Sequence, residues 1–230
     1  MAVTVASDLA ARVAEVRERI RAAAPDPDRV TLVAVTKGFG AAVVRDALAA
    51  GLADIGESYV QELVAKADEL AAEPGPAGAG PRWHAIGRLQ RNKVRKAAPH
   101  VALWHSVDRL ALGAEIARFA PGAAVLVQVN VAGEATKGGC EPAEVPALVD
   151  GLADRGLDVR GIMAMAPAGP PEGARPVFNA ARELRDRLGL PEASMGMTDD
   201  YEVALSEGAT IVRVGRGLFG PRPLEGGARH

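Results

Sequence analysis

Sulfur and imidazole side chains are scarce in this sequence, and their scarcity excludes several kinds of site. The 230-residue chain has one cysteine, Cys140, so an intrachain disulfide is impossible. It has four histidines, and neither an HExxH nor a CxxC pattern occurs. These patterns supply the ligands of common zinc sites, so we expect no metal centre. GxSxG and P-loop patterns are also absent, which removes two further classes of enzyme motif.

Long apolar runs are missing as well. A membrane-spanning helix needs about 18 or more consecutive apolar residues, and no such stretch occurs. The first twenty residues mix Asp8, Glu15 and Arg17 with apolar residues, whereas a secretory signal has a basic start and an unbroken apolar run. A solitary cysteine fits a reducing compartment. We therefore expect a cytoplasmic protein without a membrane partner.

The charge balance argues against a nucleic-acid partner. The formal net charge is −2, from 27 basic and 29 acidic residues. Proteins that bind nucleic acid through phosphate contacts usually present a basic face. The one dense basic stretch, residues 88–96, lies among acidic segments. We expect this stretch to form a solvated rim, and a second anion site there is an open alternative.

Short runs rich in valine and isoleucine alternate with longer amphipathic runs. This rhythm favours one α/β domain over 1–230, a closed (β/α)8 barrel of the TIM type, with an open doubly wound sheet as the rival. Apolar residues at helical spacing, from Leu9 to Ile20, predict an extra N-terminal helix that covers the place of a missing crossover helix. The predicted strands are 31–35, 54–55, 83–86, 101–107, 124–131, 159–164, 193–197 and 210–214. The predicted helices between them are 40–50, 57–72, 90–98, 108–119, 141–154, 172–188 and 199–207.

Lys37 is the first candidate site residue, because it directly follows the first predicted strand. Function gathers at the carboxyl ends of strands in parallel α/β folds. Partial burial disfavours the ammonium form, and a neutral amine can form a Schiff base with an aldehyde. A surface lysine just past a strand is the alternative.

The end of the last strand is the second candidate. Three glycines follow the strand in residues 211–220, and glycines let backbone N–H groups approach an anion closely. Barrels often bind phosphate with the loops after strands seven and eight, and strand seven leads into a hydroxyl-bearing turn at 194–200. Arg213 alternates with apolar neighbours, so it is expected to face inward. A tight turn with a structural ion pair is the alternative.

Two further segments carry polar groups near strand ends. Residues 56–62, which include Ser58, follow strand two and suit either a site rim or an ordinary helix start. His84 lies within an apolar strand, where it faces either a site or a hydrogen-bonded core. Both residues are included among the candidate cofactor-binding residues.

Taken in order, these segments resemble one family. They read AVTK at 34–37, IGESYVQE at 55–62, WHAIGRLQRNK at 83–93, HSVD at 105–108, QVN at 128–130 with TKG at 136–138, RGIM at 160–163, SMGMTDD at 194–200 and VRVGRGLFG at 212–220. In this order they resemble the YggS/PROSC-type pyridoxal phosphate homeostasis proteins. The likeness covers most of the chain from about 31 to 221.

The resemblance implies a pyridoxal phosphate barrel of fold type III, like the N-terminal barrel of bacterial alanine racemase. It implies that Lys37 carries pyridoxal 5′-phosphate as a Schiff base and that Arg213 lies near the pyridine nitrogen. The residues implied around the phosphate are Ser194, Gly196, Thr198, Gly215 and Arg216. The chain departs from the family at two places: Ser58 stands where the family usually has Asn, and Gly38-Phe39-Gly40 replaces a commonly found second lysine and proline.

The function implied by the resemblance is that of a carrier and buffer of pyridoxal phosphate that hands it to apo-enzymes dependent on this cofactor. A racemase-like enzyme is the alternative. It would need a second base, which alanine racemase takes from a tyrosine of another domain, and the tyrosines here are Tyr59 and Tyr201. A Schiff-base aldolase and a ligand-free scaffold are weaker alternatives. With no second domain in the sequence, we expect a monomer, and we assign no catalytic residue.

Overall fold

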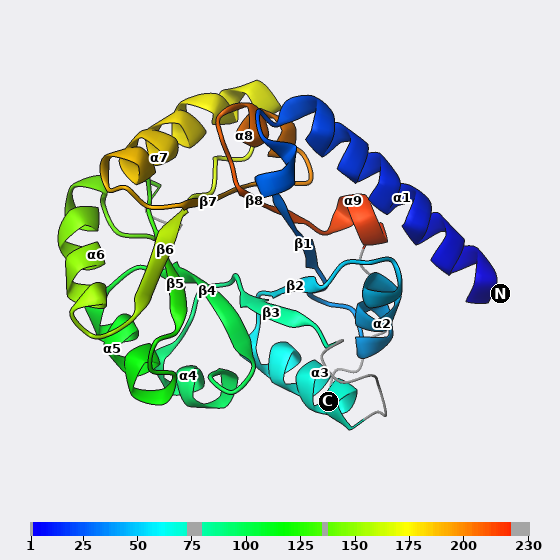
Figure 1. The fold of residues 1–230 in the computed structure, drawn as a ribbon, viewed down its shortest axis with the longest axis horizontal. Helices are drawn as coiled ribbons and strands as arrows, with labels where there is room; N and C mark the ends of the chain where they lie inside the picture. Colours follow the sequence, from blue (N-terminus) through cyan, green and yellow to red (C-terminus); the bar gives the residue numbers. More distant parts are fainter. Residues whose placement is uncertain (1, 73–79, 135–137, 222–230) are drawn as a thin grey trace.

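Eight parallel strands close into a barrel in the computed structural model of the chain (Figure 1). The structure describes residues 2–72, 80–134 and 138–221, with side chains from residue 8 onward. The strands pair in sequence order, and β8 pairs with β1 to complete the circle. They are β1 Thr31–Val35, β2 Asp54–Glu57, β3 Arg82–Ala85, β4 Val101–Val107, β5 Ala124–Gln128, β6 Asp158–Met163, β7 Glu192–Met197 and β8 Ile211–Val214. The predicted barrel is therefore confirmed and the open sheet is wrong.

Helices surround the barrel, as Figure 1 shows. The α-helices are α1 Ala2–Ala23, α2 Ala41–Ala49, α3 Val60–Ala71, α4 Arg91–Ala97, α5 Leu110–Phe119, α6 Val145–Ala153, α7 Arg175–Arg187, α8 Tyr201–Ser206 and α9 Arg216–Phe219. Short 3-10 helices are η1 Pro27–Arg29, η2 Pro142–Glu144 and η3 Pro171–Ala174. The prediction covers α2 to α8, but it has only a glycine turn where α9 lies.

The N-terminal helix α1 lies outside the barrel beside α8, α9 and α2 (Figure 1). Its apolar stripe, from Leu9 to Ile20, is buried. The Nη1 atom of Arg12 donates to the carbonyl of Leu218 at the end of α9, over 3.0 Å. Among the described residues, the short α9 is the helix that follows β8, and α1 covers the position that an eighth crossover helix would take, as predicted.

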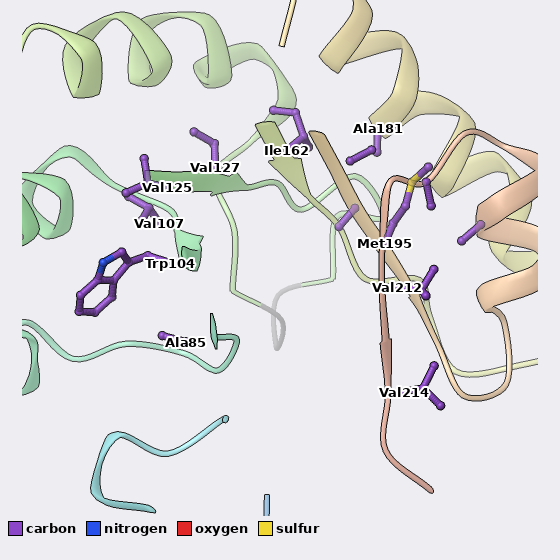
Figure 2. Packing of buried hydrophobic residues seen from close by; sticks show 14 of the residues in the cluster. Ala85, Trp104, Val107, Val125, Val127, Ile162, Ala181, Met195, Val212 and Val214 are labelled. Atoms are coloured by element: carbon purple, nitrogen blue, oxygen red, sulfur yellow. The ribbon is translucent and has the colours of Figure 1, made fainter. Parts of the chain in front are cut away.

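Side chains alternate between the two faces of each strand. Val212 and Val214 of β8 belong to the large cluster packed between strands and helices, part of which Figure 2 shows. Ile211 therefore faces the barrel interior, where it packs with Val33, Leu126 and Met163 in a second, smaller cluster. The interior is thus apolar in part, and the inward positions that remain carry polar side chains.

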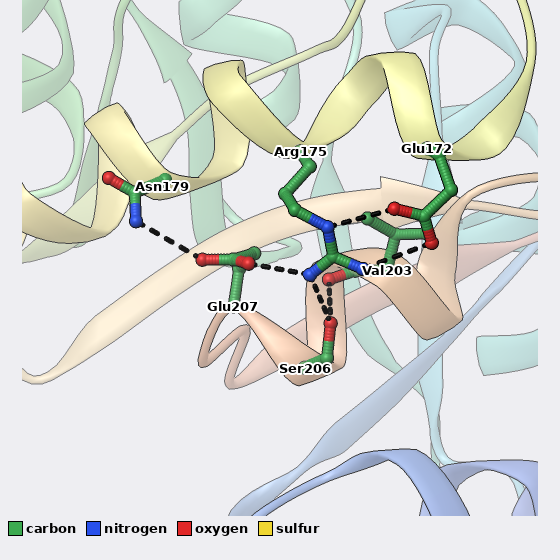
Figure 3. Close-up of polar contacts among 6 residues, drawn as sticks. All are labelled: Glu172, Arg175, Asn179, Val203, Ser206 and Glu207. Atoms are coloured by element: carbon green, nitrogen blue, oxygen red, sulfur yellow. Dashed lines mark hydrogen bonds and ion pairs between the residues drawn. The ribbon is translucent and has the colours of Figure 1, made fainter.

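Arg175 fixes the short helix α8 against α7 (Figure 3). Its guanidinium donates to Glu172 over 2.8 Å and to Glu207, just after α8, over 2.6 Å. The Nη1 atom that donates to Glu207 also donates to the hydroxyl of Ser206, over 3.1 Å. These contacts fix the C-terminal end of α8. The N-terminal end of α8 follows the loop after β7. This loop contributes to the site described next.

Candidate functional site

A cavity of about 700 Å³ opens at the carboxyl ends of the barrel strands. Its volume falls within the range of roughly 300–1,000 Å³ that is usual for small-molecule sites. Of the nine candidate residues, six line it: Lys37, Ser58, Thr198, Arg213, Gly215 and Arg216. As expected for sites at the carboxyl ends of barrel strands, the loops after β1, β2, β7 and β8 surround one cavity.

The backbone on either side of Lys37 is held by a buried cluster between β2 and α3. Lys66 donates to the carbonyl of Thr36 over 2.8 Å. On the other side, the N–H of Gly38 donates to Glu62 over 2.8 Å. Gly38 has a φ of 78°, a conformation that glycine adopts without strain. The chain at Lys37 is thus fixed while its side chain lines the cavity.

Glu57 is the centre of that cluster. Its Oε1 atom accepts from the hydroxyl of Thr36 over 2.6 Å and from Lys66 over 2.5 Å. Its Oε2 atom is buried and has no hydrogen-bond partner. Burial raises the pKa of Glu57 above its ordinary value of 4.5, although Lys66 and Thr36 act in the opposite direction. The cluster therefore combines a strong ion pair with an uncompensated carboxylate oxygen.

The loops after β7 and β8 join at the cavity. Arg216 forms an ion pair with Asp199, and the N–H of Gly217 donates to the hydroxyl of Thr198 over 3.4 Å. A Cβ atom at Gly215 would meet the carbonyl of Val35, in β1, at 3.2 Å. The loop after β8 consequently lies close to the strand end that carries Lys37.

Arg213 projects from β8 into the interior, as predicted, and reaches the cavity. Its Nη1 atom donates to Ser194 over 2.5 Å and its Nη2 atom to the carbonyl of Ala164 over 3.2 Å. Burial lowers the pKa of Arg213 to about 10, so the guanidinium stays charged at neutral pH. The alternative, a tight turn with a structural ion pair, is represented by Arg216 and Asp199, whereas Arg213 donates to a hydroxyl and a carbonyl.

The three other candidates lie outside this cavity lining. Ser194 lies behind Arg213, as its hydrogen-bond acceptor. Gly196 has a φ of 88°, and a Cβ atom there would meet Tyr201 of α8 at 2.8 Å. His84 lines a different, smaller cavity of about 270 Å³ at the amino ends of the strands. The contacts of Gly196 and His84 are those of a turn and a hydrogen-bonded core.

Several lining residues were missed by the sequence reasoning. Gln128 ends β5 and lines the cavity, where its Nε2 atom donates to the carbonyl of Gly138 over 2.7 Å. Gly87 packs so closely on Ser58 that a Cβ atom would meet the Ser58 carbonyl at 2.1 Å. A polar residue at the end of an apolar strand was a usable signal for Gln128. The close approach of Gly87 to Ser58 depends on a neighbouring loop, so no local pattern in the sequence indicates it.

The cavity carries an excess of positive charge. Its described lining includes the cations Lys37, Arg88, Arg213 and Arg216 and a single carboxylate, Asp199. Clefts lined by one sign of charge attract ligands of the other sign. Tyrosine, histidine and cysteine do not occur among the described residues that line it. The geometry therefore offers an amine beside an anion site.

The described residues contain neither a metal-ligand cluster nor a helix suited to a membrane. Within 2–72, 80–134 and 138–221, no three histidine, cysteine or carboxylate side chains gather as a metal site would need. None of the helices described there has the length and apolarity needed to cross a bilayer.

The sole cysteine, Cys140, is buried, and burial raises the pKa of its thiol to about 11. Thr136 and Lys137, quoted in one of the motifs, lie outside the described residues.

Comparison with known proteins identifies similar chains. The family model described as "Alanine racemase, N-terminal domain" matches residues 7–223. The pyridoxal phosphate homeostasis protein of Pseudomonas aeruginosa is 44% identical over 227 residues, which cover 95% of this chain and 96% of that one. The protein of the same name from Escherichia coli K12 is 36% identical over 233 residues and covers 94% and 97% of the two chains.

Solved structures agree with this likeness. PipY of Synechococcus elongatus PCC7942, solved with pyridoxal phosphate bound, matches with a TM-score of 0.80 and 36% identity, over 92% of this chain and 100% of that one. Alanine racemase from Corynebacterium glutamicum matches with a TM-score of 0.70 over 97% of this chain and 63% of that one. At 16% identity this second likeness shows the fold alone.

Proposed function

The chain belongs to the alanine racemase N-terminal domain family and, within it, to the pyridoxal phosphate homeostasis proteins, and from this premise we propose that it binds pyridoxal 5′-phosphate through Lys37 and serves as a carrier and buffer of it. The observation that carries the proposal is the shared cavity. It brings the Lys37 amine together with the loops after β7 and β8 and with an excess of cationic side chains.

The chemical groups of the residues that line the cavity fit this cofactor. Pyridoxal phosphate supplies an aldehyde, with which a lysine amine forms an imine and releases one water molecule. The phosphate group is dianionic near neutral pH, and Arg216, Thr198 and Gly215 offer a cation, a hydroxyl and a glycine backbone for it. Ser58, which follows β2, supplies a further hydroxyl to the lining. Ser194 and Gly196 support these loops from behind the lining.

Arg213 decides which chemistry this site favours. Arginine has only hydrogen-bond donors, so it can donate to a pyridine nitrogen but cannot accept a proton from a pyridinium. A ring that stays unprotonated is a weak electron sink, and most amino-acid chemistry on this cofactor depends on that sink. An arginine at this position therefore fits holding the cofactor better than catalysis with it.

The racemase-like alternative needs a second base, and neither tyrosine is placed to supply one among the described residues that line the cavity. Tyr59 is 58% exposed at the start of α3, and Tyr201 is buried at the start of α8. Neither lines the cavity within the described part of the chain. The homeostasis names of the relatives point the same way. We propose a protein without robust catalysis, whose recipients are apo-enzymes that use this cofactor, and which acts as a monomer in the cytoplasm.

The first experiment follows absorbance during titration with pyridoxal phosphate, then borohydride reduction and peptide mapping. We expect a visible band that reduction removes, with a single tagged residue, Lys37. Lys37→Ala should lose the adduct and keep its melting temperature within about 2 °C, because the side chain lines a cavity. Lys96→Ala, which removes an exposed lysine of α4, is the matched control and should behave as wild type. An adduct at another lysine in Lys37→Ala would contradict the assignment.

A further inference from the structure

Five polar side chains cross the barrel interior in one hydrogen-bonded line. Arg213 donates to the Oγ atom of Ser194 over 2.5 Å, and this atom lies 2.9 Å from Nδ1 of His105. The Nε2 atom of His105 lies 2.9 Å from Nδ1 of His84. The Nε2 atom of His84 lies 3.0 Å from Oδ1 of Asp54. The line begins at the cofactor cavity and ends in the smaller cavity at the amino ends of the strands.

The chemistry of the end residues allows one continuous direction. Because arginine only donates, Ser194 accepts from Arg213, and its hydroxyl proton is available for Nδ1 of His105. When Ser194 donates to Nδ1, a neutral His105 carries its proton on Nε2 and donates to His84, which by the same rule donates to Asp54.

The opposite end requires the same direction. An ionised carboxylate only accepts, so Asp54 needs the proton on Nε2 of His84. Burial alone would raise the pKa of Asp54, but hydrogen bonds from His84 and Arg82 outweigh it and lower the pKa to about 2. Burial, followed by the charges of His84 and Arg213, holds the pKa of His105 well below its ordinary value of 6.5. The bond directions at the two ends are thus compatible with one line that runs from the donor Arg213 to the acceptor Asp54.

The surroundings make this arrangement costly to disturb. The other inward residues packed at this level are apolar, among them Val33, Leu126 and Met163. A buried donor or acceptor that loses its partner there costs about 1–3 kcal/mol. Reversing one bond would leave a serine or imidazole hydrogen without an acceptor in the line. The five groups are therefore expected to change orientation together.

We propose that Asp54 and His84 are positioning residues for Arg213, which fix the orientation of its guanidinium from the opposite mouth of the barrel. The inference rests on the proposed function in that Arg213 faces the bound cofactor. It assigns to His84 an indirect role in place of the direct cofactor contact expected from the sequence. It also makes the smaller cavity the place from which the cofactor site is tuned, since Asp54 and His84 both line it.

The direction of the line is tested without cofactor. Long-range ¹H–¹⁵N correlation spectra of the ¹⁵N-labelled protein report which imidazole nitrogen carries the proton, and single substitutions assign the four histidines. We expect the Nε2–H form in both His84 and His105. A proton on Nδ1 of either ring, or a doubly protonated His105 at neutral pH, would overturn the proposed polarity.

The coupling is tested by Asp54→Asn against a matched control. Glu192→Gln also replaces a carboxylate by an amide at the first residues of a strand and in the same small cavity, but Glu192 pairs with Thr210 and Arg160 instead. Members of one hydrogen-bond network couple energetically, so we expect Asp54→Asn to weaken pyridoxal phosphate binding roughly 3- to 10-fold, or about 0.6–1.4 kcal/mol, and to shift the absorbance band. Glu192→Gln should stay within about twofold of wild type. Equal effects of the two substitutions would remove the positioning role.

The guanidinium NMR signals of Arg213 provide a readout that is independent of the cofactor. Asp54→Asn should shift them in the cofactor-free protein, and Glu192→Gln should not. If wild type fails to bind pyridoxal phosphate while these signals shift, the proposed function fails and the positioning role stands. If Asp54→Asn does not fold, His84→Gln interrupts the line one bond further in and is read by the same signals. Unshifted Arg213 signals in the folded variant would refute the coupling.

Discussion

The ion pair between Glu57 and Lys66 allows a sharp test of what holds the backbone at Lys37 in place. Glu57 and Lys66 have side chains that are 0% and 6% exposed, and they approach to 2.5 Å. Lys66→Met keeps a side chain of similar length and apolar stem but removes the ammonium. The Glu57 carboxylate would then stay buried with the hydroxyl of Thr36 as its donor, over 2.6 Å.

The size of the effect follows from this burial. Removing one partner of a buried ion pair typically destabilises a protein by about 3–5 kcal/mol, because the remaining charge is left uncompensated. For a chain of this length, each kcal/mol corresponds to roughly 2–4 °C in melting temperature. We therefore expect Lys66→Met to melt roughly 10 °C below wild type at pH 7.

The cost should depend on pH with a definite sign. Burial already raises the pKa of Glu57 above 4.5, and removal of Lys66 takes away the charge that opposed this rise. A carboxyl with a higher pKa in the folded than in the unfolded protein binds its proton more tightly when folded. Folding is therefore favoured as the pH falls from above the folded value toward 4.5. The gap between Lys66→Met and wild type should narrow from pH 7 to pH 5.

Urea unfolding of both proteins at pH 7 and pH 5 measures this directly. The double variant Glu57→Gln with Lys66→Met replaces the buried charge by a neutral amide that still accepts from Thr36. It should recover at least half of the lost stability at pH 7. A loss below about 1 kcal/mol, which is typical of an exposed pair, would refute the reasoning, as would a double variant no more stable than Lys66→Met.

Two further predictions concern the cavity wall. Gly87→Ala should destabilise the protein by roughly 1–3 kcal/mol and weaken cofactor binding, because the new methyl group meets the Ser58 carbonyl at 2.1 Å; Gly169→Ala, with nothing within 4 Å, is the control in melting and titration experiments. Equal melting temperatures for the two variants would contradict the close packing. Arg213→Ala should retain the borohydride-reducible adduct at Lys37 but shift the absorbance band, and an unchanged band and affinity would remove Arg213 from the ring environment.

Much of the fold follows from local sequence pattern. The alternation of valine- and isoleucine-rich runs with amphipathic runs locates all eight strands and α2 to α8. The boundaries differ where tertiary contacts decide them. β5 ends at Gln128, before the predicted 131, and Val129 instead forms a single bridge with Cys140. The short helix α9 lies in a glycine-rich segment that reads as a turn, and Arg12 of α1 caps it from a distant part of the chain.

The candidate site, like the fold, follows in part from local sequence and in part from tertiary contacts. Lys37, Arg213 and Thr198 could be placed because being at or near a strand end is a local property. The depth of His84 along the barrel axis could not, because strand stagger sets it, and the β3–β4 pairing shifts register between Trp83 and His84. The hydrogen bonds of His105 join residues 21 and 89 positions apart, which no local pattern encodes.

The loop that carries Lys37 is held on both sides of that residue. Thr36 and Gly38 are both tied to the cluster of β2 and α3, so the backbone at Lys37 has little freedom. The positive φ of Gly38 would cost about 1–2 kcal/mol with most other residues, so the glycine that departs from the family pattern suits this turn. The backbone at Lys37 is fixed, and Lys37 is the one lysine among the described residues that line the cavity. Under the proposed function, such a site would exchange its cargo with an incoming amine, while its described lining holds no tyrosine, histidine or cysteine to act as a second base.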